Sequence, residues 1–404
     1  MKIKKCRSCG SKNLINILSL GNQYLSDFVK VNKKPKAFPL NMILCKECFL
    51  VQLDYSAPQK YLYTERYGYK SGINQTMQDE LKGIAKESLK KVKKTNDKIV
   101  AVDIGANDGT LLKNYPKSVY RIGVEPITKF AKEAKKYADK VVNDFFTYES
   151  FSKTLKNKKA DIVTIISCFY DMEDPNKFVS DVKKIMKEDG ICVIQQNYLV
   201  GMLKQNAFDN IVHEHLEYYS LLSLNNLLAR HGLEVFDVEL RELNGGSFRT
   251  YISYKGKRRI SKSVDKQNKY EKRLGLNKKT PYLDFAKRIK NNKKRIFEFV
   301  KKQNQKGKAV YLYGASTRGN TLLQYFELDN NLIKKAVERN PEKWGKIIAS
   351  VGIPIVSEEE ARKDKPDYML VLPWFFKKEF LKREKKYLDN GGHFIFPLPK
   401  FEVV

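Results

Sequence analysis

The sequence predicts an α/β protein in which a small N-terminal module precedes two Rossmann-like units. Two Cys-x-x-Cys pairs indicate the module, and two stretches that alternate between strand-like and helix-like segments indicate the units. A chain of 404 residues is also too long for a single core, so several domains are expected. We place them at residues 1–80 (zinc-binding module), 81–255 (first Rossmann-like domain), 256–307 (helical connector) and 308–404 (second Rossmann-like domain).

The cysteine pairs, Cys6 with Cys9 and Cys45 with Cys48, have the spacing of zinc knuckles. Each pair lets two thiolates hold one side of a tetrahedral Zn²⁺, and the glycine after Cys9 allows backbone amides to point at sulfur. Four thiolates leave no coordination position for water, so we expect a structural ion. Four unrelated buried cysteines are the alternative.

The first Rossmann-like unit begins with the strand–turn–helix pattern "VAVDIGANDGTLL". Its D-x-G-x-x-x-G series differs from the dinucleotide fingerprint and, with an acidic residue at the tip of the next strand, suits S-adenosylmethionine. We expect Glu125 to accept both ribose hydroxyls, Asp108 to cap the following helix and Asp144 to lie near the adenine. A glycine turn without a ligand is the alternative. The predicted cofactor-binding residues are Asp103, Gly105, Asn107, Asp108, Gly109, Glu125 and Asp144.

The segment "NIVHEHLEYYS" places two of the four histidines on either side of Glu214. The ordinary pKa of histidine lies near neutrality, so an imidazole can serve as a general base, and a neighbouring carboxylate could fix its tautomer. Consecutive residues of an extended chain point in opposite directions, so a contact between Glu214 and His215 is a hypothesis. A packed or surface role is the alternative for either histidine, and His213 is a candidate for substrate binding.

The second Rossmann-like unit begins with "YLYGASTRGNT", where Gly314 and Gly319 frame a turn before a helix. Free amides at the start of that helix could bind a phosphate, with a charge-assisted contact from arginine. A nicotinamide dinucleotide site and a purely structural turn are the alternatives. The predicted substrate-binding residues of this unit are Ser316, Thr317, Arg318, Asn320, Glu338 and Trp374.

Composition limits the classes of protein to be considered. The formal charge of +31 invites a nucleic-acid partner, but the lysines are spread along the whole chain, which favours a solvated basic surface. No run approaches eighteen apolar residues, and the N-terminus lacks the apolar stretch of a signal peptide. We therefore expect a cytoplasmic protein with neither a membrane nor a nucleic acid as its partner.

The chain resembles the three-domain sugar C-methyltransferases that act on nucleotide-linked keto-deoxysugars. The resemblance implies a zinc module, a central class I methyltransferase domain that binds S-adenosylmethionine, and a C-terminal Rossmann-like domain that helps to enclose the nucleotide-sugar. The stretches that carry it follow the family's order and are "CRSCG", "CKECFLVQL", "DIGANDGTLL", "GVEP", "FDNIVHEHLEYYSLLSL", "NGGSFRTYI", "YGASTRGNTLLQY" and "DYMLVLPW".

The resemblance also implies roles for particular residues. The base would be His215, with Glu214 beside it, and Tyr67 or Tyr69 of "YGYKSGINQTM" would approach the reacting centre. Asn244 of "NGGSFRTYI" would contact the substrate. The residue before His-Glu-His is often tyrosine in the family, whereas this chain has Val212.

The activity implied is S-adenosylmethionine-dependent C-methylation of a nucleotide-linked 4-keto-deoxysugar. An RNA methyltransferase that uses the zinc module and basic surface, and a non-catalytic ligand-binding homologue, are the alternatives. The nucleotide, the sugar, the methylated carbon and the oligomeric state stay open, and a monomer is compatible with the sequence.

Overall fold

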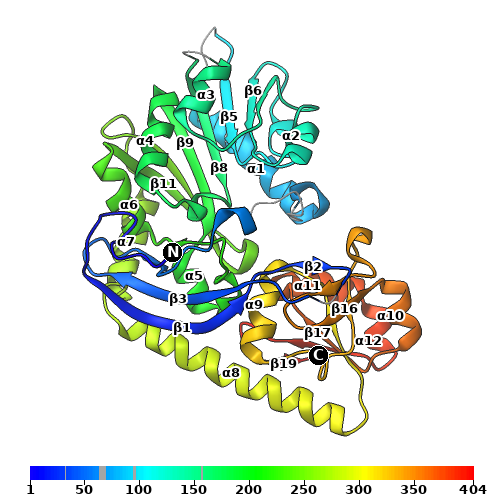
Figure 1. Ribbon diagram of the computed structural model, residues 1–404. Coiled ribbons are helices and arrows are strands. Elements are labelled where there is room, and N and C mark those ends of the chain that lie inside the picture. The colour runs from blue at the N-terminus through cyan, green and yellow to red at the C-terminus, as the bar shows by residue number, and fades with distance from the viewer. Residues whose placement is uncertain (32, 63–69, 94–96, 156–157) are drawn as a thin grey trace.

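The computed structural model describes residues 1–31, 33–62, 70–93, 97–155 and 158–404, whose strands form three sheets (Figure 1). In the first sheet, the long strands β1 (Leu14–Tyr24) and β3 (Ala37–Cys45) pair in antiparallel register. Strand β4 (Val51–Leu53) continues the sheet. The fourth strand, β10 (Glu217–Tyr218), comes from the segment just after His-Glu-His and pairs with β4.

The second sheet has the order β11-β12-β9-β8-β5-β6-β7 and is parallel from β9 to β7, whereas β12 runs antiparallel to both of its neighbours. Counted along the chain within this sheet, the order is 3-2-1-4-5-7-6, which changes direction between β5 and β8. Ligands of doubly wound sheets bind at such a switch point, beyond the carboxyl ends of the strands. The bounds are β5 (Val100–Ile104), β6 (Tyr120–Val124), β7 (Lys140–Val142), β8 (Ala160–Ile166), β9 (Met186–Asn197), β11 (Leu233–Arg241) and β12 (Ser247–Tyr254).

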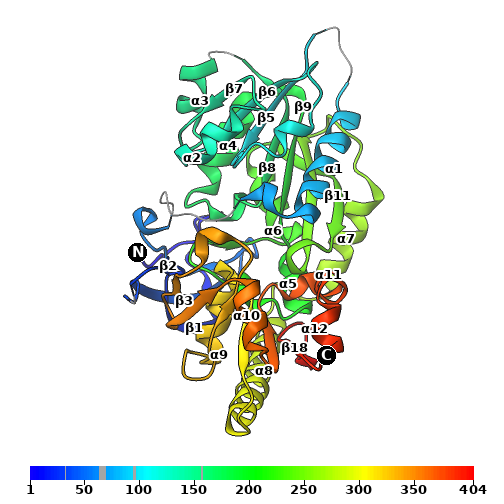
Figure 2. The ribbon, with the colours of Figure 1, turned by 90° about the vertical axis from the view of Figure 1, so that its right-hand side faces the viewer.

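Helices cover both faces of this sheet because its strands are apolar on both sides (Figure 2). In β9, Val193 belongs to the core that helix α1 (Gln75–Lys91) covers, whereas Cys192 and Ile194 belong to the core on the other face. Helix α4 (Pro175–Ile185) packs there and begins at an Asp174 side chain that caps it. The turn at Gly245 and Gly246 joins β11 and β12, as the sequence predicted.

The third sheet has the order β19-β18-β17-β13-β14-β16-β15-β2. Strands β18, β17, β13, β14 and β16 are parallel, as the second alternating stretch predicted. Its last strand, β2 (Phe28–Val29), comes from the N-terminal region and pairs with β15. The other bounds are β13 (Val310–Tyr313), β14 (Ala336–Val337), β15 (Ile347–Ile348), β16 (Ile353–Val356), β17 (Tyr368–Val371), β18 (His393–Phe396) and β19 (Glu402–Val403).

The longest of the described helices, α8 (Thr280–Gln305), lies along β1 and contacts α9 (Thr317–Phe326) of the second Rossmann-like domain, hereafter the third domain (Figure 1). Within the described residues, no helix combines the length and apolar character needed to cross a bilayer. The remaining helices are α2 (Thr128–Ala134), α3 (Tyr148–Leu155), α5 (Leu199–Lys204), α6 (Leu221–Arg230), α7 (Lys262–Arg273), α8 (Thr280–Gln305), α9 (Thr317–Phe326), α10 (Glu358–Asp364), α11 (Lys377–Arg383) and α12 (Lys385–Asp389).

The described residues after the first glycine turn do not form the α-helix that the sequence predicted. The prediction that Asp108 caps this helix is therefore wrong. The chain forms only a short 3₁₀ turn at Leu112–Asn114. Asn107 and Gly109 both have positive φ, which a continuing helix does not tolerate. The Asp108 carboxylate accepts bonds from the backbone amide and hydroxyl of Thr110 instead.

The three sheets do not correspond to three consecutive segments of the chain. Helix α1 starts before residue 81 and packs on the second sheet, β10 joins the first sheet, and β2 joins the third. The proposed domain boundaries therefore stay predictions, although helices α7 and α8 occupy most of residues 256–307.

Candidate functional site

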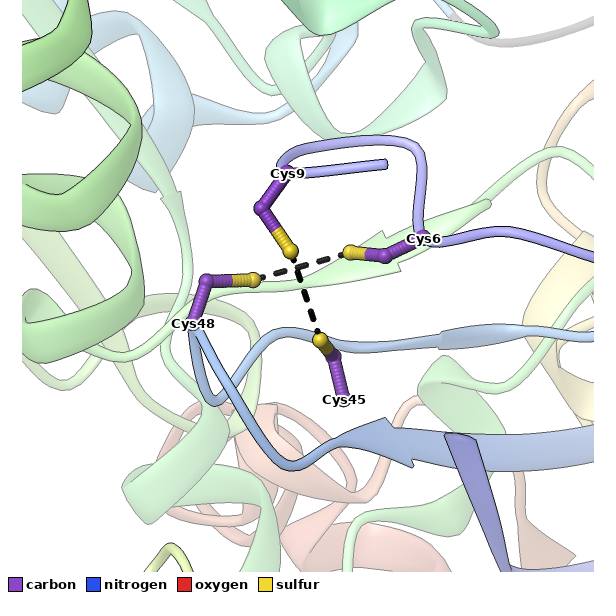
Figure 3. A group of neighbouring side chains, drawn as sticks. All are labelled: Cys6, Cys9, Cys45 and Cys48. Carbon is purple, nitrogen blue, oxygen red and sulfur yellow. Dashed lines mark hydrogen bonds between the residues drawn. The ribbon is translucent and has the colours of Figure 1, made fainter. Parts of the chain in front are cut away.

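The four N-terminal cysteines converge on one point (Figure 3). Their sulfur atoms all lie within 4.8 Å of one another, and the Cys6–Cys48 and Cys9–Cys45 sulfur pairs are each 3.5 Å apart. A tetrahedral Zn²⁺ with bonds of about 2.3 Å would separate its sulfur ligands by roughly 3.8 Å. The cluster therefore fits the structural zinc ion that the spacing predicted.

Each cysteine pair is followed by a residue in the left-handed conformation, Gly10 with φ of 74° and Phe49 with φ of 62°. These turns close the two knuckles, and Gln52 donates its amide to the Cys6 sulfur at 3.2 Å. A hydrogen bond from Cys48, with bonds from backbone amides and Gln52, lowers the pKa of Cys6 to about 5. Cys6 thus favours the thiolate, which is the form that binds zinc, whereas the same hydrogen bond raises the pKa of Cys48 and burial raises the pKa of Cys45.

The predicted cofactor turn lies at the switch point. Gly105 has φ of 75°, and a side chain there would meet the Cys168 sulfur at 2.9 Å, so only glycine fits. Asp103 is buried at the end of β5, and its carboxylate accepts a bond from the Thr164 hydroxyl at 2.6 Å. Burial, with a contribution from Glu125, raises the pKa of Asp103 to about 7.

Glu125 follows β6 at the same edge of the sheet. It is buried, and burial raises its pKa. One carboxylate oxygen accepts the Asn107 amide at 2.8 Å and the other accepts the Ile127 amide at 2.9 Å. These bonds fix the carboxylate at the glycine turn, and its contact with ribose hydroxyls stays a prediction. Asp144 follows β7 at this edge and is exposed, with its carboxylate on the amide of Phe145.

Two backbone amides that the sequence analysis missed lie over the glycine turn. The Ser71 amide donates to the Asn107 side chain at 3.0 Å, and the Gly72 amide donates to the Asp108 carboxylate at 2.9 Å. Gly109 packs against α2, where a side chain would meet the Ala134 Cα at 2.8 Å. A narrow cavity beside the turn is lined by Ser71, Met77, Leu81, Asp103, Gly105, Ala106, Leu111, Ile166 and Ser167.

The three residues of the His-Glu-His segment have different surroundings. His213 is buried, its Nε2 donates to the Phe38 carbonyl at 3.1 Å, and burial lowers its pKa to about 4. The His215 Nδ1 donates to the Asn210 carbonyl at 2.8 Å, and burial lowers the pKa of His215 to about 3. Among the described contacts, Glu214 and His215 share no hydrogen bond or ion pair and line different cavities.

His215 lines a small cavity together with residues that follow the ends of strands β8 and β9. The Tyr170 ring lies 4.3 Å from the imidazole ring, centroid to centroid. The Tyr218 hydroxyl is buried without a hydrogen-bond partner among the described residues. Apart from His215, sequence reasoning missed this lining, although side chains that follow parallel strands are natural candidates. The lining residues are Tyr170, Asn197, Tyr198, Leu199, Met202, His215, Glu217 and Tyr218.

A larger cavity of about 380 Å³ lies between the first and third domains, with Glu214 on its wall. Burial raises the pKa of Glu214. Thr317, the first residue of α9, is the predicted substrate-binding residue that lines this cavity, and four lysines line it as well. These lysines are Lys33, Lys34, Lys36 and Lys60.

The other predicted substrate-binding residues of the third domain form hydrogen bonds with other residues of the chain. Ser316 caps α9, and Asn320 is buried with bonds to Ser26 and Ser350. The Glu338 carboxylate accepts three backbone amides, those of Ala315, Arg339 and Asn340.

Arg318, Trp374 and the Asn244 carbonyl form one interdomain contact around Asp209. Their roles as substrate ligands stay predictions. Tyr67 and Tyr69 lie outside the described residues.

Replacing one zinc ligand tests the metal site. We expect purified Cys45→Ser to lose most of its bound zinc, because three thiolates no longer close a tetrahedral site. Metal analysis by mass spectrometry measures the stoichiometry. Cys192→Ala is the matched control, since Cys192 is buried in β9 outside the cluster. Equal zinc content in Cys45→Ser and the wild type would contradict the assignment.

Glu125→Gln tests the ribose contact. Hydrogen bonds to a charged group contribute roughly 1.5–3 kcal/mol, so the Kd for S-adenosylmethionine should rise at least about tenfold. Isothermal titration measures this Kd, and circular dichroism checks that the variant is folded. An unchanged Kd in a folded variant would exclude Glu125 from cofactor binding.

Three family models match the chain and together span most of it. A putative zinc binding domain matches residues 6–63, a methyltransferase domain matches residues 73–238, and a C-methyltransferase C-terminal domain matches residues 242–399. The C-methyltransferase NovU of Streptomyces niveus is 29% identical over 409 residues, which cover 100% of this chain and 97% of NovU.

Solved structures resemble the chain over a smaller part. The plantazolicin methyltransferase BpumL in complex with SAH is 12% identical, with a TM-score of 0.35 over 43% of this chain and 82% of BpumL. A chain from the complex of the Haloferax volcanii Trm112 methyltransferase activator and a methyltransferase is 15% identical, with a TM-score of 0.36 over 45% of this chain and 93% of that one. The strand order, rather than these low scores, carries the fold assignment.

The matched domains, the cysteine cluster and the full-length relative confirm the family expected from the sequence. The chain belongs to the zinc-containing C-methyltransferase family and is an S-adenosylmethionine-dependent methyltransferase.

Proposed function

We propose that this enzyme methylates a carbon beside the ketone of a nucleotide-linked 4-keto-deoxysugar, with His215 as the base. The observation that carries the proposal is the orientation of the imidazole. A backbone carbonyl can only accept a hydrogen bond, so the bond to Asn210 requires the proton on Nδ1. The lone pair is then on Nε2, on a ring that lines the cavity at the strand ends.

An unactivated sugar carbon is not a nucleophile. Methylation of a carbon therefore needs a base that removes its proton. Nε2 would accept the proton of the carbon next to the ketone, and the electron pair of that bond would delocalise onto the ketone oxygen as an enolate. Bound S-adenosylmethionine supplies an electrophilic methyl group. The new carbon–carbon bond would replace the carbon–sulfur bond, and the imidazolium would return its proton to solvent.

The developing negative charge on the ketone oxygen needs a hydrogen-bond donor. The sequence points to Tyr67 or Tyr69 for this role. Tyr218 is a further candidate, because its buried hydroxyl has no partner among the described residues and it lines the cavity of His215. Burial raises the pKa of this phenol, and the Val212 backbone lies close enough to lower it, but the two groups do not meet in hydrogen-bond geometry. The family often has a tyrosine at position 212.

The large cavity supports the nucleotide part of the substrate. A diphosphate carries concentrated negative charge, and four lysine side chains with the first turn of α9 would neutralise it. Glu214 lies on the wall of this cavity, while its neighbour His215 lines the small one. A nucleotide-sugar could therefore contact both sides of the same segment, which supports a small-molecule substrate over RNA.

His215→Asn tests the base together with the substrate class. With a labelled methyl donor and a panel of nucleotide-linked keto-sugars, we expect mass spectrometry to show a methylated 4-keto-sugar for the wild type. The variant should turn over about 10²–10⁴-fold more slowly, as expected when a general base is lost, and should bind S-adenosylmethionine normally.

His231→Gln is the control for this variant, since His231 ends α6 and contacts Asn176 rather than the cavity. Normal turnover by His215→Asn would remove the base assignment. Failure of every keto-sugar with the wild type would remove the substrate class.

The pH dependence of kcat/KM follows from the lowered pKa of His215 in the protein without substrate, which is about 3 because of burial. Protonation of the base should stop turnover only as the pH falls through this low pKa. At a saturating concentration of S-adenosylmethionine, we therefore expect little loss of kcat/KM for the nucleotide-sugar between pH 8 and about pH 5, which lies well below the ordinary histidine pKa near 6.5. Steady-state kinetics across this range measure the profile. A midpoint near pH 6.5 would contradict the lowered pKa of the base.

A further inference from the structure

Arg318 is committed to contacts between the third domain and the segment that carries the base. It is the second residue of α9, and its guanidinium donates to the Asp209 carboxylate at 2.7 Å and to the Asn244 carbonyl at 3.0 Å. The guanidinium carbon also lies 4.9 Å from the centre of the Phe375 ring. Because the guanidinium is held by Asp209, Asn244 and the Phe375 ring, it has little freedom to bind a phosphate.

Asp209 is the other end of this contact and is almost fully buried, at 1% exposure. The oxygen that accepts Arg318 also accepts the Trp374 indole N–H at 3.2 Å. A carboxylate buried this deeply needs a charged partner, and Arg318 supplies it. The third domain thereby fixes residue 209 in space.

The next residue along the chain holds the imidazole. The Asn210 carbonyl accepts the His215 Nδ1, so the position of this carbonyl sets both the ring orientation and the tautomer. A second bond from the third domain, from the Thr321 hydroxyl to the Ile211 carbonyl at 3.0 Å, lies on the other side of Asn210. Residue 210 is thus clamped between two contacts with α9.

We propose that Arg318 is a positioning residue, which acts through Asp209 and the Asn210 carbonyl to hold His215 with its Nε2 free for proton abstraction. The inference rests on the proposed role of His215. It replaces the interpretation of Arg318 as a phosphate ligand. The third domain then contributes to the rate of methyl transfer as well as to substrate binding.

Three variants test this proposal. Arg318→Gln and Asp209→Ala each break the contact, whereas the double variant Asp209→Leu/Arg318→Met replaces the buried pair with apolar side chains. Such replacements often leave a protein stably folded, so the double variant protects against a single variant that does not fold. Arg288→Gln is the matched control, because Arg288 ties α8 to Asn206 and the Leu203 carbonyl, just before the segment.

We expect each of the three test variants to lower kcat by about 10–100-fold, as small displacements of a catalytic group do, with little change in KM for the nucleotide-sugar. The loss in the double variant should not exceed that in the single variants by much, because one contact is broken in all three. Arg288→Gln should keep the wild-type kcat. A phosphate-ligand role predicts the opposite pattern, with a raised KM and retained kcat for Arg318→Gln and normal kinetics for Asp209→Ala.

A measurement without substrate separates this proposal from the proposed function. The chain has four histidines, so ¹⁵N-labelled histidine gives four imidazole spin systems, and His215→Asn identifies the signal of His215. In the wild type and Arg288→Gln, His215 should be the neutral Nδ1–H tautomer. In the folded test variants it should become a mixture of tautomers. An unchanged tautomer with an unchanged kcat would overturn the proposal, whichever sugar is the substrate.

Discussion

The conformation of residues 208–218 depends on contacts from both outer domains, which are the zinc module and the third domain. On one side, the Leu53 amide donates to the Leu216 carbonyl and β10 pairs with β4 of the zinc module. On the other, α9 donates to Asp209 and to the Ile211 carbonyl, and Phe208 packs on Phe326. The catalytic domain therefore does not shape its own His-Glu-His segment alone. The geometry of the segment depends on contacts from the zinc module and from the third domain.

The zinc ion belongs to this construction even though its four thiolates leave no place for a substrate. Gln52 donates to the Cys6 sulfur and accepts the Arg7 amide through its side chain, while its backbone lies opposite Glu217 in the pairing of β4 with β10. Gln52 thus connects the zinc site to the strand against which the end of the His-Glu-His segment pairs.

Local patterns predicted much of the architecture, because strand runs, glycine turns and cysteine spacing are set by neighbouring residues. They placed the parallel strands, the zinc ligands and the glycine turn beside Glu125. They failed where distant segments meet. Nothing near Asp209 shows that its partner is Arg318, and "FV" at residues 28–29 is too short for a strand period to appear. Burial likewise depends on the assembled core, so the sequence suggested a near-neutral pKa for His215, whereas the fold lowers it. The helix expected after Asp108 failed for a local reason, because Gly109 adopts a positive φ through which a helix does not continue.

Strand β2 belongs to the N-terminal region but pairs with β15 of the third sheet, which limits where the chain can be divided into separate fragments. A fragment that starts at residue 308 would keep β15 but lose Phe28 and Val29, which cover its outer edge. The uncovered edge would offer unpaired backbone groups to other chains, a common route to aggregation. A fragment that ends at residue 80 would likewise lack β10, and its β4 would be exposed. Separate expression of the outer domains would therefore need these short strands grafted back, although they contribute only two residues each.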